Sequence, residues 1–419
     1  MKVIDFTLHY QGKNFDAIVA GGGPAGIGAA YAAAGMGAKV LLVEQTGRLG
    51  GTAIQSLVGP LMGLVQSRMV DEILAAIGGT CPDFSRMDLD LYELLAARRV
   101  EILLHTTVIK PLGDDNRVGG LQLKCREGFR DVYARCVIDA TGDGDIAFLA
   151  GVPFESGRDS DRLTQPMSIM YTIGGIDPAR RFACCSELEA RHLTVGGRSW
   201  EAIVEEAAGR GELPEMVTVI RLYNAIRPTE SIVNAAQVNY LDGCRSADLT
   251  RAEIEGRRQA FRITDFLRRT LPGYENVHVA AMPAAIGVRE TRRFEGIARL
   301  EKADCLAGRK FADAIVHRAQ FAIDIHNPSG GGQADGDTGT ADRVQPYDIP
   351  FGVLLPRRVD GLLLAGRCIS ASHEALASCR VMRIAMAIGV GAGAAAAWAA
   401  RHGCRVRDVP VAELQKLLS

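Results

Sequence analysis

The chain has little excess charge of either sign. Of its 419 residues, 48 are Lys or Arg and 49 are Asp or Glu, so the formal net charge is −1. Nucleic acids and anionic membrane surfaces are bound by a concentrated basic face. The composition therefore offers no electrostatic case for either partner, and we expect no nucleic acid.

The chain also lacks the cysteine spacings of metal-binding proteins. It has ten cysteines, but none form a C-x-x-C pair, and only Cys184 and Cys185 are adjacent. Large size and irregular spacing favour reduced thiols in a cytoplasmic protein. No metal site and no iron–sulfur cluster are expected.

Long apolar runs are almost absent. Met1–Lys13 is interrupted by Asp5 and His9, so we expect no signal peptide there. Only Ile384–Ala400 is long and uncharged, and it consists mainly of Ala and Gly. At this length, between Arg383 and Arg401, it favours a buried, close-packed helix over a membrane span.

What the chain does contain is a strong dinucleotide-binding pattern in Phe15–Glu44. A short apolar strand leads into Gly21-Gly-Gly-Pro-Ala-Gly26, an Ala-rich helix follows, and a second strand ends in Glu44. Gly21 permits the sharp turn, Gly23 lets the backbone approach a pyrophosphate, and Gly26 lets helix and strand pack closely. A carboxylate at Glu44 accepts hydrogen bonds from ribose hydroxyls.

Later segments extend this α/β pattern. Glu101–Val108 is expected to be a strand, and Cys136–Asp145 is a strand ending in Thr-Gly-Asp-Gly at the edge where ligands of open α/β sheets bind. Near the end of the chain, strand Leu362–Gly366, a polar loop Ser370–Ala375 and the Ala/Gly helix Cys379–Trp398 are expected to rejoin the same sheet. There is no second glycine fingerprint, so no separate nicotinamide domain is expected.

Together with the Gly21–Gly26 turn, several stretches resemble the FAD-dependent oxidoreductases of the glutathione-reductase-type, two-dinucleotide-binding-domain fold. More narrowly, the chain resembles a bacterial FAD-dependent oxidoreductase family of mostly unassigned substrate. The matching stretches are Gly287-Val-Arg-Glu-Thr-Arg-Arg293, Ile323-Asp-Ile-His-Asn-Pro328, Ala365-Gly-Arg-Cys-Ile-Ser-Ala-Ser-His-Glu-Ala375 and Arg380-Val-Met382.

At 419 residues the chain exceeds what one core usually holds, so two domains are expected. The resemblance implies an α/β fold: a Rossmann-like FAD-binding domain with a parallel sheet, interrupted by an α+β substrate or cap domain. The FAD-binding domain would comprise 1–153 and 347–419, and the cap 154–346, with returns to the FAD domain near 277–296.

The resemblance also implies the residues that hold FAD. They lie in the glycine turn, at the end of the second strand, in the following loop, after the Thr-Gly-Asp strand, and in the closing strand and helix. They are Gly21, Gly23, Pro24, Ala25, Gly26, Glu44, Arg48, Gly51, Thr52, Val108, Thr141, Gly142, Asp143, Gly366, Arg367, Val381 and Met382.

The leading hypothesis for function is hydride transfer between a small organic substrate and flavin N5. His373 and then His326 are the candidate proton-transfer groups, because imidazole titrates near neutral pH, and Arg289 is the candidate clamp for a substrate carboxylate or carbonyl. A buried ion-pair network around Arg289–Arg293 is the structural alternative.

Two other functions stay open on the sequence. One is a flavin-dependent monooxygenase, and the other is a flavin-bearing electron-transfer subunit of a larger complex. The partners expected are a small-molecule substrate and an electron donor or acceptor, and a homo-oligomer is compatible with the sequence.

Overall fold

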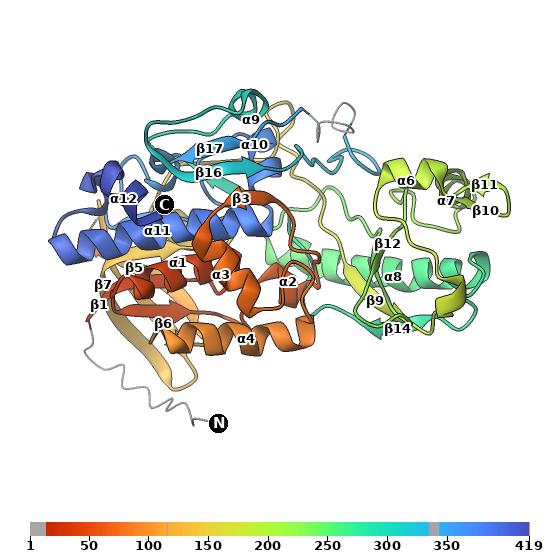
Figure 1. Ribbon diagram of the computed structural model, residues 1–419, viewed down its shortest axis with the longest axis horizontal. Helices are drawn as coiled ribbons and strands as arrows, with labels where there is room; N and C mark the ends of the chain where they lie inside the picture. The colour runs from red at the N-terminus through yellow and green to blue at the C-terminus, as the bar shows by residue number, and fades with distance from the viewer. Residues whose placement is uncertain (1–13, 115, 335–342, 419) are drawn as a thin grey trace.

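The computed structural model describes residues 14–114, 116–334 and 343–418. Figure 1 shows a larger body that contains both ends of the described chain and a smaller body beside it. The expectation for Met1–Lys13 lies outside the described residues.

The larger body is built on a seven-stranded sheet in the order β4-β2-β1-β7-β6-β5, with β18 also paired to β7. Strands β4, β2, β1, β7 and β18 are mutually parallel, whereas β5, β6 and β7 are antiparallel. The expected α/β fold with a parallel sheet is confirmed. The strands are β1 (Asn14–Ala20), β2 (Val40–Val43), β4 (Glu101–Leu103), β5 (Thr107–Asp114), β6 (Arg117–Cys125), β7 (Gly128–Asp139) and β18 (Leu362–Leu364).

The long strand β7 explains how the two ends of the chain meet. Its last residues pair with β1 on one side and with β18 on the other. Segments some 340 residues apart in sequence therefore share one sheet, as expected, and their carboxyl ends lie at one edge.

Two helices, α1 (Pro24–Gly35) and α11 (Met382–His402), pack closely against each other in the core of this body (Figure 1). Glycines make the close approach possible. A Cβ added at Gly389 would lie 1.9 Å from the carbonyl oxygen of Ala25, and one added at Gly393 would lie 2.1 Å from that of Ala29.

Helix α11 also answers the question of a membrane span. Among the described residues it is the one helix long and apolar enough to cross a bilayer, and 89% of its apolar window is buried inside the protein. The expectation of a close-packed core helix is confirmed by this burial.

The smaller body has its own hydrophobic core, formed by residues between Met167 and Ile286. A four-stranded antiparallel sheet in the order β12-β13-β9-β14 packs with helix α8 and is capped by α6 and α7. These elements are β9 (Met170–Gly174), β12 (Arg221–Asn224), β13 (Ser231–Asn234), β14 (His278–Ala281), α6 (Glu187–His192), α7 (Trp200–Gly209), α8 (Ser246–Thr270) and the hairpin β10 (Thr194–Val195) with β11 (Arg198–Ser199).

The core of the smaller body is formed by a shorter stretch of the chain than the expected cap of 154–346. Phe294, Leu300 and Ile315 belong to the core of the larger body. Strand β16 from this part of the chain lies between β17 and β3 in a three-stranded sheet, and β15 pairs with β8. The remaining elements are β3 (Leu64–Gln66), β8 (Phe154–Ser156), β15 (Arg292–Phe294), β16 (Ala314–Gln320), β17 (Tyr347–Pro350), α2 (Thr52–Gln55), α3 (Arg68–Ala76), α4 (Phe84–Ala97), α5 (Asp145–Leu149), α9 (Lys302–Ala307), α10 (His373–Cys379) and α12 (Val411–Leu418), with short 3-10 turns at Pro178–Arg180, Phe351–Leu354 and Val406–Asp408.

Two local expectations are wrong. The single strand at 101–108 is split, because the chain turns at His105 (φ 50°) and the backbone N–H groups of His105 and Thr106 donate to the carbonyls of Thr46 and Glu44. The polar loop at 370–375 is buried instead, and the Ser372 side chain accepts a hydrogen bond from the N–H of Ala375, so His373 begins helix α10.

The packing of α1 on α11 gives a first prediction. We expect Gly393→Ala to lower the melting temperature, because the new methyl group overlaps the Ala29 carbonyl and overpacking costs about 1–3 kcal/mol. Gly209→Ala in α7 is the matched control: a Cβ there meets nothing within 4 Å, and Ala is the better helix former. Equal melting temperatures for Gly393→Ala and the wild type would contradict this close packing.

Candidate active site

The glycine turn at 21–26 has the geometry that its sequence predicts. Gly21 has φ +101°, and a Cβ there would lie 2.3 Å from the carbonyl oxygen of Ala140. A Cβ at Gly26 would lie 1.8 Å from the carbonyl oxygen of Gly21. Protein packing alone therefore requires both glycines.

Gly23 is different, because nothing in the protein requires a glycine there. Its φ is −76°, and the nearest atom to an added Cβ is the Cα of Gly51, at 3.8 Å. Protein atoms therefore leave the space beside Gly23, at the first turn of α1, unfilled. Free N–H groups at a helix N-terminus bind phosphate, so this cradle fits the pyrophosphate of a dinucleotide.

Glu44 lies next to this cradle and is 8% exposed. Its Oε2 accepts the N–H of Gly22 at 2.7 Å, and its Oε1 accepts the N–H of Thr46 at 2.8 Å. An ionised carboxylate has about four acceptor positions, so lone pairs remain for ribose hydroxyls. The Glu44 carboxylate therefore also fits the binding of FAD.

The structure places other residues expected to hold FAD in differing surroundings. Thr52 is the first residue of α2 and lines the main cavity, and Val108 is half-buried in β5. Arg48 is engaged elsewhere: its Nε donates to Oδ2 of Asp88 at 2.6 Å, and its side chain is 42% exposed. The structure thus gives Arg48 a partner on α4 rather than a free charge for a phosphate.

Asp143 joins three separate parts of the chain. Its Oδ1 accepts hydrogen bonds from Thr291 Oγ1 at 2.8 Å and from Arg367 Nη2 at 2.9 Å. The preceding Thr141 donates its hydroxyl to the buried Asp139 at 2.7 Å. The Thr-Gly-Asp segment after β7 therefore positions Arg367 from the closing segment.

Arg367 supplies another test of fit with a cofactor. Its Nη1 is buried and has no hydrogen-bond partner in the protein, while the residue lines the main cavity together with Val381 and Met382. Gly366, with φ +85°, packs against the start of α1. A buried guanidinium N–H without an acceptor is costly, and a bound FAD would supply one.

The main cavity has a volume of about 390 Å³ and lies between the two bodies. Residues expected to hold FAD line one part of it, and residues of the smaller body and its connections line the rest. The polar and charged residues of the lining are Thr52, Ser168, Cys185, Ser186, Glu187, Arg221, Tyr223, Asn234, Arg289, Asp324, His326, Gln333, Arg367 and Arg380.

Two of these arginines have carboxylate partners inside the cavity. Arg221 forms an ion pair with Glu187, and Arg380 Nη2 lies 3.3 Å from Asp324 Oδ2. No role is expected from the sequence for Arg221 or Asp324. The signal for Arg221 is an arginine inside the apolar run Val217–Tyr223, where it is 7% exposed.

Arg289 has no such partner. Among the described residues, no carboxylate lies within 4.0 Å of it, and its Nη1 donates to the carbonyl oxygen of Pro166 at 2.6 Å. Burial and the neighbouring Arg380 lower the pKa of Arg289 to about 9, so its guanidinium stays charged at neutral pH. The negative charge of Asp324 acts on Arg289 from beyond ion-pair distance, so among the described residues Arg289 is the arginine of this lining without a carboxylate in direct contact.

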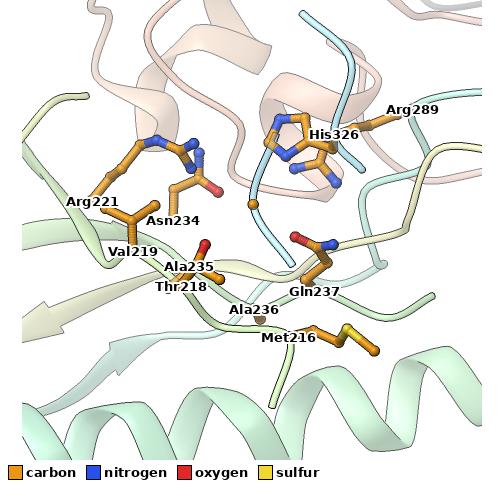
Figure 2. Close-up of a pocket in the computed structure, with 11 residues that line it drawn as sticks. Met216, Thr218, Val219, Arg221, Asn234, Ala235, Ala236, Gln237, Arg289 and His326 are labelled. Atoms are coloured by element: carbon orange, nitrogen blue, oxygen red, sulfur yellow. The ribbon is translucent and has the colours of Figure 1, made fainter. Parts of the chain in front are cut away.

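His326 lies beside Arg289. Figure 2 shows both side chains at one end of a small polar chamber that opens from the cavity lining, with Arg221 and Asn234 on the other side. Burial and the charge of Arg289 lower the pKa of His326 to about 3, so the imidazole is neutral. Its Nε2 lies 3.7 Å from Asp324 Oδ2.

His373, the favoured candidate from the sequence, does not line this cavity. Its Nδ1 lies 2.8 Å from Glu290 Oε1, and Glu290 also pairs with Arg293. All three side chains are buried. The buried ion-pair network expected as the structural alternative is thus present at Glu290 and Arg293, and Arg289 lies outside it.

The open space at Gly23 gives a second prediction. Because an added Cβ meets no protein atom closer than 3.8 Å, we expect the Gly23→Ala apoprotein to fold and melt like the wild type. FAD affinity should fall, since the methyl group enters the space assigned to the pyrophosphate. Fluorescence titration of apoprotein with FAD measures the loss, and an unchanged dissociation constant would place the pyrophosphate elsewhere.

The chain is similar to several known proteins. Digeranylgeranylglycerophospholipid reductase 1 of Methanopyrus kandleri is 29% identical over 155 residues, which are 30% of this chain and 40% of that enzyme. The match thus spans less than half of the relative's length.

Two solved structures of similar shape are a geranylgeranyl bacteriochlorophyll reductase-like protein from Thermoplasma acidophilum and a myxobacterial chondrochloren halogenase. The first is 15% identical, covers 97% of this chain and 83% of its own, and has a TM-score of 0.49. The second is 14% identical, covers 96% and 78%, and has a TM-score of 0.46.

The family model described as FAD dependent oxidoreductase matches residues 16–418. This range includes the glycine turn, the cavity and the closing helix. The protein therefore belongs to the FAD-dependent oxidoreductase family, and its cofactor is FAD.

Proposed function

We propose that this enzyme transfers a hydride between a small organic anion and flavin N5. One observation carries the proposal: a single cavity touches Thr52, Arg367 and Met382, assigned to FAD, and also Arg289 and His326. FAD, when bound, supplies the redox chemistry, and the protein supplies binding, orientation and charge.

Arg289 is proposed to bind the anionic group of the substrate. Its guanidinium has a planar fork that matches a carboxylate, and one protein carbonyl is its hydrogen-bond acceptor among the described residues. A charge-assisted pair with Arg289 orients the substrate as well as binding it.

His326 is proposed to move the proton that accompanies hydride transfer. A neutral imidazole can accept a proton, and the charge of Arg289 is one of the causes that lower its pKa. An anion bound to Arg289 offsets that charge, which raises the pKa of His326 and makes it a better acceptor in the complex.

We further propose a glutathione-reductase-type arrangement of the FAD domain and a cytoplasmic location. All ten cysteines are free, which suits a reducing compartment. An electron donor or acceptor must complete the catalytic cycle, and a homo-oligomer is compatible with this function.

The reaction class is tested by mixing the FAD-loaded enzyme anaerobically with a panel of carboxylic acids, alcohols, amines and enones. We expect an acid to bleach the flavin absorbance without any other reagent. Oxygen uptake coupled to NADPH oxidation would support a monooxygenase instead. A stable co-purifying partner protein, without bleaching by any compound, would support an electron-transfer subunit.

A third prediction separates the two histidines. With a reducing substrate, we expect His326→Gln to slow flavin reduction by about 10²–10⁴-fold, the usual contribution of a positioned proton-transfer group. His373→Gln is the matched control: it should lower the melting temperature, because His373 lies within the buried Glu290 network, and reduce the rate far less. Stopped-flow absorbance measures both rates, and the reverse order would restore His373 as the candidate.

A further inference from the structure

We infer that the substrate is a monocarboxylate with an apolar body, bound with its carboxylate at Arg289. This inference rests on the proposed function and specifies the substrate class of the same cavity. Three observations support it: the balance of charges in the cavity lining, the small size of the chamber beside Arg289, and the apolar surface of the rest of the cavity wall.

The lining holds one positive charge in excess. Four arginines line the cavity, and three have a carboxylate within ion-pair distance: Glu187 for Arg221, Asp324 for Arg380 and Asp143 for Arg367. The fourth, Arg289, has none among the described residues. One anionic group therefore completes the pairing.

A second anionic group would find no partner. The charges of Arg221 and Arg380 are already matched, and Asp324 also accepts a hydrogen bond from Gln333 Nε2 at 2.7 Å, which fixes its carboxylate in the wall. An extra carboxylate on the substrate would lie near this fixed negative charge. Such a charge is costly to desolvate without a counter-ion.

The space beyond Arg289 is also too small for another functional group. The chamber in Figure 2 is lined by Arg289, His326, Asn234 and Gln237 among others, and its volume is about 10 Å³. That is close to the room needed for one water molecule. The rest of a substrate bound at Arg289 therefore extends into the main cavity rather than into this chamber.

Apolar atoms make up most of the exposed surface of the lining. Met62 and Met170 contribute flexible, polarizable side chains that adapt to ligand shape, and Phe321 adds an aromatic surface. The apolar side chains of the lining that are not assigned to FAD are Val58, Pro60, Met62, Met170, Val288, Phe321 and Ala322. An apolar body beside the carboxylate gains from burial against these side chains.

The test uses isothermal titration calorimetry on the FAD-loaded protein with three probes of matched body. These are 3-phenylpropanoate, the neutral 3-phenylpropan-1-ol and the dianionic phenylsuccinate. We expect 3-phenylpropanoate to bind about tenfold or more tightly than either of the others, since a hydrogen-bonded charged pair is typically worth a factor of this order.

Variants assign the preference to Arg289. Arg289→Gln should abolish the discrimination between acid and alcohol while leaving the alcohol affinity within about twofold, because only the charge pair is lost. Arg289→Lys keeps the charge and should retain part of the preference for the acid. Arg251→Gln is the matched control, since Arg251 is on α8 with a side chain 72% exposed, and it should change nothing.

The outcomes separate this inference from the proposed function. Tighter binding of phenylsuccinate or of the alcohol, an Arg289→Gln variant that keeps the preference, or no binding of any probe would overturn the inference. Arg289-dependent binding of 3-phenylpropanoate, in an enzyme whose flavin no acid reduces, would support the inference and contradict hydride transfer. If Arg289→Gln does not fold, the comparison of the three probes on wild type and Arg289→Lys decides.

Discussion

The arrangement of the active site depends on one buried carboxylate, that of Glu290. A fully buried charge must be paired and hydrogen-bonded, and Glu290 meets this requirement with the N–H of Gln165, the guanidinium of Arg293 and the imidazole of His373. Arg293 in turn donates to the carbonyls of Gly157 and Ala371. One charge thereby ties together segments near residues 157–165, 290–293 and 371–373, where the smaller body joins the larger one. Arg289, the next residue along the chain, is held at the cavity by this anchor.

The parts of the fold that the sequence predicts well are those determined by local chemistry. The three glycines of the turn, Glu44 and helix α11 each have a signal within a short window, because a backbone approach or an uninterrupted apolar run shows directly in the residue types. The break at His105 has no such signal. It arises because the N–H groups of His105 and Thr106 bond to the loop after β2, some 60 residues earlier.

The residues of the candidate site also depend on contacts between distant segments, which the sequence does not predict. The sequence favours His373 over His326, but both side chains are buried, so burial does not distinguish them. What separates them is the partner that each meets in space: Glu290 for His373, and Asp324 with Arg289 for His326. Likewise, Arg289 differs from Arg221 only because Glu187 pairs with the latter. These pairings join distant segments, and charge patterns along the chain do not encode them.

The close packing of α1 and α11 links the FAD cradle to the cavity. Gly389 lies against Ala25 and Gly393 against Ala29, so the two helices run parallel in a fixed register. Seven residues separate Gly389 from Met382, the first residue of α11, which places that helix start about 10 Å beyond the level of Ala25 at 1.5 Å per residue. Both helix N-termini therefore point the same way, one at the cradle beside Gly23 and the other at the cavity wall. A shift of one helix along the other would change the distance between these two sites, so the glycines that allow the close contact also fix the span over which FAD must fit.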